Sequence, residues 1–189
     1  MIRKLMICPI GGKDQPREVS VMSDSRELVP EALAAAEAAA RGEDVHFDSE
    51  TSVGYLLRDT YRAFTKILQA RISAHGVTIG QWYFLRVLWD EDGVTQRELS
   101  LRVGMMEPTT VTALNGMEKR GYVRRVRNTE DKRKVNIYLT ETGQALRNVL
   151  LPQAIDVNIR SVAGVSPDDV ETVRRTLHAM KQNLDALAV

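Results

Sequence analysis

Length, composition and charge set the first limits on what this chain can be. Its 189 residues are 43% hydrophobic and 27% charged, which suits a soluble protein with a core of its own. The single cysteine excludes an internal disulfide and a cysteine-based zinc cluster. The three histidines lie far apart in the sequence, and we expect no metal or other cofactor. No apolar run approaches the roughly 18 residues of a membrane span, and none forms a secretory signal, so we expect a cytoplasmic protein without a membrane partner.

The net charge of +1 conceals an uneven distribution along the chain. Residues 1–50 carry six basic and ten acidic side chains, whereas residues 119–134 carry eight basic and two acidic ones. A local basic cluster of this kind is typical of a surface that binds nucleic acid, although a solvated charged surface gives the same count.

The N-terminal part of the chain differs in composition from the rest. Residues 1–25 contain paired glycines and two prolines and predict a loose tail. Residues 26–41 are rich in alanine, the strongest helix former, and predict a helix that ends at Gly42. We therefore expect residues 1–50 to form an N-terminal extension.

Two longer helices are predicted next. Residues 53–75 place apolar side chains at helical spacing, and Gly76 ends the pattern. Thr78 followed by Gln81 is a possible capping box, which would begin a second helix that ends near Gly93.

A short helix and a third long one follow. Thr95 and Glu98 repeat the capping signal, and the short helix that they begin closes at Gly104. Pro108 suits the first turn of the next helix, which is expected to run to Arg120. Its inner row is predicted to be Thr110, Ala113, Leu114 and Met117.

The period of the pattern then changes from helix to strand. Residues 122–126 and 135–139 alternate apolar with polar side chains, and a polar turn at 128–133 separates them. This is the pattern of a β-hairpin. Thr140 is the expected N-cap of a further helix, in which Pro152 should cause a kink or a break.

The last helix is predicted to begin at Ser166 and Pro167. Its apolar residues recur at steps of three and four, a spacing that suits either one face of a core helix or a seam against a partner chain. These residues are Val170, Val173, Leu177, Met180, Leu184 and Leu187.

The order helix, short helix, helix, hairpin is that of a winged helix-turn-helix, in which the second helix of the turn fits the major groove of DNA. The predicted fold class is therefore mainly α with a small β-hairpin wing. The outer face of the residue 108–120 helix is small and polar, which suits contact with base edges, although a plain solvated face is the alternative. Its outward positions are Pro108, Thr112, Asn115 and Lys119, flanked by Thr109, Val111 and Gly116.

A motif across the hairpin resembles the hallmark of the MarR family of bacterial transcription regulators. Asp131-Lys132-Arg133 is followed, after five residues, by Leu139-Thr140-Glu141-Thr142-Gly143. The resemblance covers about residues 53–187. It implies that Arg133 enters the minor groove, with Asp131 holding its guanidinium and Lys132 beside it, and that Thr95 and Gln96 meet phosphate.

The same resemblance implies a homodimer on a near-palindromic site of double-stranded DNA. Residues 94–139 would form the winged helix-turn-helix domain, and residues 53–93 and 140–189 the helical dimerisation region. Members are usually released from DNA by a small ligand, often an aromatic acid, and aromatic and arginine side chains would suit such an acid or its acyl-CoA thioester. The candidate ligand residues are Tyr61, Arg62, His75, Trp82, Tyr83 and Arg86.

Other hypotheses remain open at this point. Trp82 could belong to the core, and Arg62 and Arg86 could form ion pairs. Some family members sense oxidants through a cysteine, which here would be Cys8, and a few bind zinc, for which the histidines are His46, His75 and His178.

The function itself also has an alternative, a winged-helix interaction module whose N-terminal extension binds a partner, without ligand response. The sequence shows no nucleophile paired with a base and no glycine-rich phosphate loop, so we expect no enzyme.

Overall fold

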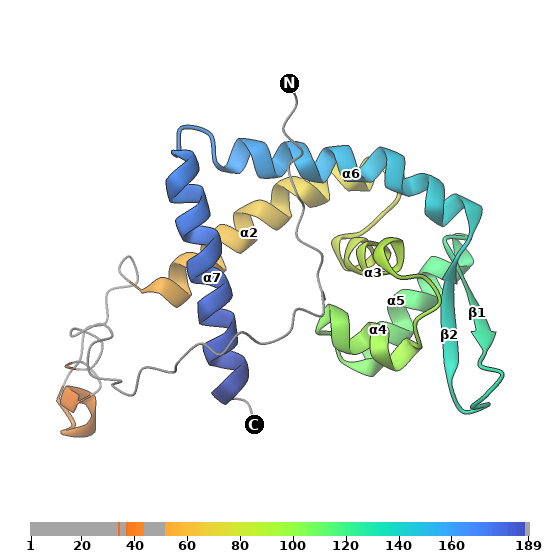
Figure 1. Cartoon of the computed structure of the whole chain (residues 1–189), viewed down its shortest axis with the longest axis horizontal. Coiled ribbons are helices and arrows are strands. Elements are labelled where there is room, and N and C mark those ends of the chain that lie inside the picture. Colours follow the sequence, from red (N-terminus) through yellow and green to blue (C-terminus); the bar gives the residue numbers. More distant parts are fainter. Residues whose placement is uncertain (1–33, 35–36, 44–51, 188–189) are drawn as a thin grey trace.

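The computed structural model describes residues 34, 37–43 and 52–187 (Figure 1). The predicted loose tail, Cys8 and His46 lie outside these residues. Among the described residues, no helix is long and apolar enough to cross a membrane. Residues 37–40 are helical, and Gly42 has a φ of 74°, which agrees with the predicted helix end there. The later elements are α2 (Val53–Ile72), η1 (Ser73–His75), α3 (Ile79–Asp90), α4 (Gln96–Val103), α5 (Glu107–Lys119), β1 (Val123–Arg127), β2 (Val135–Leu139), α6 (Glu141–Ser161) and α7 (Pro167–Leu187).

The predicted helix starts are confirmed. Thr78 and Gln81 form a reciprocal capping box at the start of α3. The Thr95 hydroxyl accepts from the Glu98 N–H, and the Thr140 hydroxyl accepts from the N–H three residues later. These bonds satisfy amide groups that the first turn of a helix would otherwise leave without a partner.

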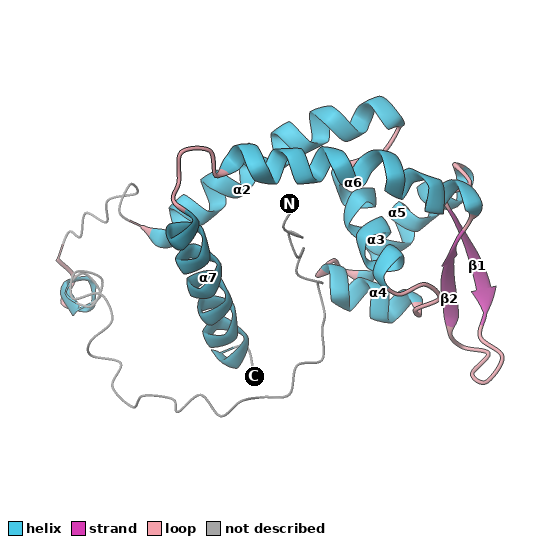
Figure 2. Cartoon of the chain, turned by 45° about the horizontal axis from the view of Figure 1, so that its top comes forward, coloured by secondary structure: helices cyan, strands magenta, loops and turns pink. Residues whose placement is uncertain are grey.

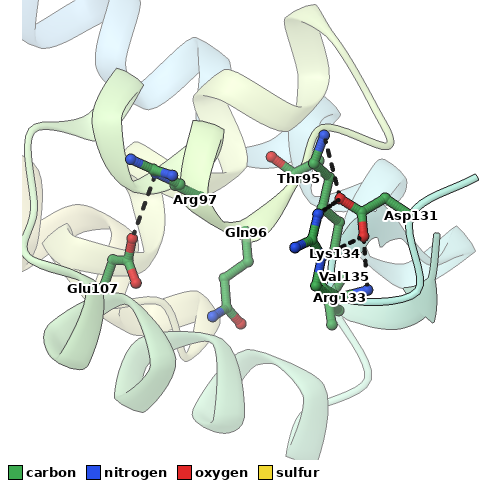
Figure 3. A pocket seen from close by; sticks show the side chains of 8 residues that line it. All are labelled: Thr95, Gln96, Arg97, Glu107, Asp131, Arg133, Lys134 and Val135. Carbon is green, nitrogen blue, oxygen red and sulfur yellow. Dashed lines mark hydrogen bonds and ion pairs between the residues drawn. The ribbon is translucent and has the colours of Figure 1, made fainter.

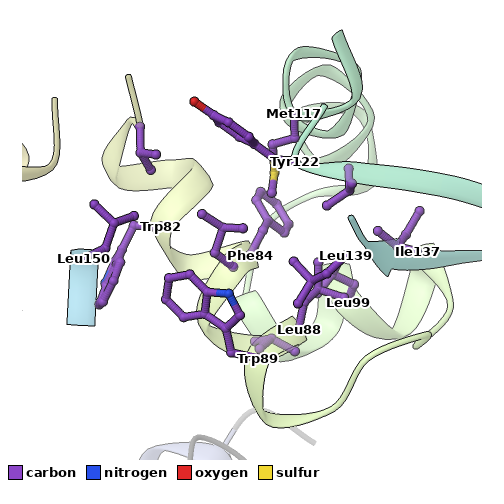
Figure 4. Packing of buried hydrophobic residues seen from close by; sticks show 14 of the residues in the cluster. Trp82, Phe84, Leu88, Trp89, Leu99, Met117, Tyr122, Ile137, Leu139 and Leu150 are labelled. Atoms are coloured by element: carbon purple, nitrogen blue, oxygen red, sulfur yellow. The ribbon is translucent and has the colours of Figure 1, made fainter. Parts of the chain in front are cut away.

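The core is built around α3 (Figure 4). Phe84, Leu85 and Leu88 are completely buried. Trp82 and Trp89 pack edge to face with their ring centroids 5.6 Å apart. The other described contributors come from every neighbouring element, and they include Leu68, Ile72, Leu99, Leu114, Met117, Ile137 and Leu150.

The predicted hairpin is present as an antiparallel pair in which Val123 lies opposite Leu139. It is fixed to the helical body along β2. The Ile137 N–H donates to the Val94 carbonyl at 2.9 Å, and the Asn136 side chain donates to the Gly93 carbonyl at 2.6 Å. Because one strand is bonded along its outer edge, the wing is part of the folded body rather than a free arm.

The start of α6 packs tightly against the hairpin and the core. A Cβ atom on Gly143 would overlap the carbonyl oxygen of Tyr122, so this helical position accepts no side chain. The carbonyl of Gly143 also accepts from the Trp89 indole N–H at 3.0 Å. Further along, α6 runs through Pro152 as one helix, so a break at this residue is contradicted. Proline costs a helix one hydrogen bond, which a long helix packed along α2 can absorb.

The helices outside the winged part leave apolar side chains uncovered. In both views α2 and α6 lie side by side, while α7 stands apart from the winged part of the chain (Figures 1 and 2). The Asp156 carboxylate of α6 forms ion pairs with Arg71 of α2 and with Arg160 of its own helix. None of the described residues of α7 is buried, and Leu184 and Leu187 are 62% and 81% exposed. The apolar seam of α7 is therefore unpacked within one chain.

Candidate nucleic-acid interface

Helix α5 presents the two faces that its sequence predicts. Thr110, Leu114 and Met117 are fully buried, and Ala113 packs against the core. Of the predicted outward and flanking residues, only Gly116 is half-buried. The exposed ones are Pro108, Thr109, Val111, Thr112, Asn115 and Lys119. The helix begins with proline in its first turn and is followed by Gly121 at a φ of 69°.

The wing tip holds an arginine in a defined orientation. The Nε of Arg133 donates to Oδ1 of Asp131 at 3.1 Å and its Nη2 donates to Oδ2 at 3.3 Å. The Arg133 side chain is nevertheless 91% exposed. Because the fork is already paired in one plane, Arg133 would lose little side-chain freedom on meeting a further acceptor.

The turn below this pair positions Asp131. The Asn128 side-chain oxygen accepts from the N–H groups of Glu130 and Asp131, both at 2.9 Å. The Asp131 carboxylate also accepts from the Arg133 backbone N–H at 3.1 Å. The side-chain and backbone bonds from Arg133 lower the pKa of Asp131, so this carboxylate stays charged at neutral pH.

A groove of about 520 Å³ separates the wing from the starts of α4 and α5 (Figure 3). The predicted residues Thr95 and Gln96 line it together with Asp131 and Arg133. The Thr95 hydroxyl already accepts the capping bond, whereas the side chain of Gln96 points between the two sides of the groove. The remaining lining residues were not predicted as site residues; they are Arg97, Glu107, Lys134 and Val135.

The basic cluster at 119–134 divides into two groups. Arg120 donates to the Gly76 carbonyl, Arg124 lies 4.9 Å from the Tyr138 ring centroid, and Arg125 pairs with Glu118. Arg127 donates to a backbone carbonyl inside the wing turn. These four arginines have structural partners, which the count of charges in the sequence does not reveal. Arg120, Arg124 and Arg127 are exposed nonetheless. The other basic residues of the cluster are also exposed, and two of them pair with Asp131. They are Lys119 and Lys132, which form no ion pair with the described residues, and the paired Arg133 and Lys134.

Four of the six predicted ligand residues contact one another in two separate pairs. The hydroxyls of Tyr61 and Tyr83 lie 3.2 Å apart, and burial together with this bond raises the pKa of Tyr83. The Arg86 guanidinium lies 5.8 Å from the Trp82 ring centroid and 4.0 Å from Asp90. Trp82 is also a core residue, as the alternative interpretation holds.

The other two predicted ligand residues, Arg62 and His75, are exposed, as is Tyr61. Arg62 lines an open depression with Lys66, Gln69 and Ile79, and the His75 carbonyl accepts from the Tyr122 hydroxyl at 3.5 Å. A separate, mostly apolar groove of about 400 Å³ lies between α2 and α6 and was not predicted; its lining includes Phe64, Ile67, Val157, Arg71 and Arg160. Among the described residues, no group of three or more His, Cys, Asp or Glu side chains is placed to hold a metal ion.

Comparison with known proteins gives consistent relatives. A family model described as MarR family matches residues 75–134. The HTH-type transcriptional regulator TtmR of Methylorubrum extorquens is 29% identical over 67% of this chain and 64% of its own length. The homoprotocatechuate degradative operon repressor of Escherichia coli is 34% identical over 41% of this chain and 52% of its own length. The chain thus spans less than two thirds of either relative.

A solved structure agrees in fold over most of its length. A MarR transcriptional regulator from Methanosarcina mazei Go1 aligns with a TM-score of 0.67 at 26% identity, over 71% of this chain and 97% of that one. The aligned fold is the winged helix-turn-helix with its flanking helices, and the relatives are transcriptional regulators rather than enzymes. The family model, these relatives and this structure together support the MarR family of transcription regulators for this chain.

Proposed function

We propose that the protein is a homodimeric repressor that binds a near-palindromic operator and is released by a small ligand of the aromatic acid or acyl-CoA type. Residues 94–139 bind DNA, and residues 53–93 and 140–189 form the dimer. The observation that carries this proposal is the wing-tip arginine. Arg133 is 91% exposed, yet Asp131 fixes its orientation. An exposed and pre-oriented guanidinium suits insertion into a narrow, electronegative minor groove.

The second contact with DNA comes from α5 in the major groove. Thr112 and Asn115 read base edges there, Val111 meets a thymine methyl group, and Lys119 faces phosphate. Residues Thr95 and Gln96 meet the backbone at the start of α4. Support comes from the exposure of this α5 face and from the start of α5, which lines the groove beside the wing.

The dimer is supported by the apolar seam of α7 and by the exposed apolar residues of α2. Val53, Leu56 and Ile67 are each about half exposed in one chain. Covering such a surface with the same surface of a second copy is the usual isologous solution, and it gives the protein a two-fold axis. That axis predicts two half-sites about one turn of DNA apart.

Two contacts between predicted ligand residues support the ligand response: the Tyr61 and Tyr83 hydroxyls, and the Arg86 guanidinium with the Trp82 ring. The name of the E. coli relative, a repressor of a degradative operon, supports it as well. The end of α5 is tied to the end of α2, because Arg120 donates to the Gly76 carbonyl and Tyr122 to the His75 carbonyl. A ligand that binds one placement of α2 better than another would therefore change the spacing of the two α5 helices.

Binding of promoter and random duplexes by the purified full chain tests this proposal. At physiological salt, the wild type should prefer one promoter site by at least about a thousandfold. Arg133→Ala should lose most of that affinity, whereas Arg147→Ala, which removes an exposed arginine on α6, should not. Equal affinity for promoter and random DNA would contradict specific regulation and favour the interaction-module alternative.

A further inference from the structure

The groove between the wing, α4 and α5 contains two carboxylates in different situations. Asp131 accepts three N–H bonds from Arg133, so its charge is used within the wing. Among the described residues, Glu107 has one ion-pair partner, Arg97, whose Nε lies 4.0 Å from its carboxylate, and no hydrogen bond to that carboxylate. The Glu107 side chain is 61% exposed and the Arg97 side chain is 83% exposed. Figure 3 shows the ion pair between them. Glu107 thus places a solvated carboxylate, which can only accept hydrogen bonds, on the surface that is proposed to bind DNA.

The position of Glu107 places it on the base-reading side of α5. It is the first residue of the helix, and the N-terminal residues of a recognition helix are those that contact base edges. Residues four and eight positions later, Val111 and Asn115, continue the same exposed stripe. The carboxylate therefore faces the major groove if α5 enters it, as the proposed function requires.

A carboxylate at this place discriminates strongly among bases. Cytosine presents an amino donor in the major groove without an acceptor of its own, whereas the acceptors of guanine and thymine would repel the carboxylate. Away from such a donor, the negative charge lowers affinity because it lies near phosphates. We propose that Glu107 accepts a hydrogen bond from the N4 amino group of one cytosine in each half-site and so specifies a C·G pair. This inference rests on the proposed binding of duplex DNA.

Selection from randomised duplexes, followed by competition with single-pair variants, tests the readout. The wild type should require C·G at one symmetric position, with about tenfold weaker binding when it is replaced. Glu107→Ala should lose the preference there. Glu107→Gln should move it toward A·T, because a side-chain amide pairs with adenine N6 and N7.

Glu130 supplies the matched control, since it is an exposed carboxylate in the wing turn. Glu130→Ala and Glu130→Gln remove the same charge, so they should raise general DNA affinity and keep the base preference. If the Glu107 variants behave in the same way as these controls, the readout is wrong although DNA binding stands. If the wild type has no base preference, the proposed function fails and the readout fails with it.

Discussion

At the scale of single residues, the proposed contact of the wing tip with DNA depends on the shape of the Arg133 side chain as well as on its charge. Arg133 is held through two of its nitrogens by Asp131, a geometry that lysine cannot reproduce. Arg133→Lys keeps the positive charge but loses the planar fork. We expect about tenfold weaker operator binding, with an unchanged slope of affinity against salt, measured by fluorescence anisotropy. An affinity equal to that of the wild type would show that charge alone acts at this position.

The same pair predicts how the wing responds to acid. Bonds from Arg133 lower the pKa of Asp131 below its ordinary value of 3.8. Because the pKa of Asp131 is lowered, its charged pair with Arg133 is fully present above the ordinary pKa and is lost as the pH falls through the lowered pKa. Wing geometry should therefore stay constant between about pH 5 and pH 8.

Carboxyl ¹³C NMR titration of Asp131 checks this, and the midpoint should lie below 3.8 and rise in Arg133→Gln. A midpoint at or above the ordinary value in the wild type would mean that the two side chains are not paired in solution.

How well the sequence predicts the site also varies by residue. Asp131 and Arg133 could be identified because their motif is local, two residues apart in one turn. Arg97 and Glu107 could not, because their ion pair depends on how α4 packs on α5. The arginines of β1 were grouped with the wing tip by charge, but contacts with Glu118 and Tyr138 that only the fold creates give them structural roles.

At the scale of elements, the start of α6 packs closely on the backbone before β1, and Gly143 leaves less room for a Cβ atom than any other described glycine. Gly143→Ala would force a Cβ atom onto the Tyr122 carbonyl and push α6 away from Trp89. We expect a loss of about 3 kcal/mol in the free energy of unfolding, measured in urea. Gly54→Ala is the control, since its Cβ meets nothing closer than 4.0 Å in an exposed helical position. That variant should be neutral or slightly stabilising. Equal stability of the two variants would contradict the packing described.

The elements themselves were largely predictable because their signals are local. Capping residues fix the starts of α3, α4 and α6, and glycines at positive φ follow η1, α4 and α5. The outcome at Pro152 was less predictable, since whether a proline breaks a helix depends on the packing of α6 along α2. Likewise, the bonds from Ile137 and Asn136 to the loop after α3 join residues more than 40 positions apart.

At the scale of the whole molecule, the proposed dimer depends on the exposed apolar face of α7. Leu184→Asp places a charge in the seam, and we expect it to shift the protein from dimer to monomer in analytical ultracentrifugation and to weaken operator binding. Gln182→Asp adds the same charge to the same helix away from the seam and should leave the dimer intact. A wild type that sediments as a monomer, or a Leu184→Asp variant that stays dimeric, would show that this face is not the interface.

In the proposed complex, two α5 helices and two wings hold one duplex symmetrically, and hydroxyl-radical footprinting on a selected operator examines this arrangement. We expect two protected stretches of DNA backbone about one helical turn apart, each flanked by a minor-groove protection that disappears in Arg133→Ala. Protection of a single half-site, or flanking protection that persists in Arg133→Ala, would contradict it.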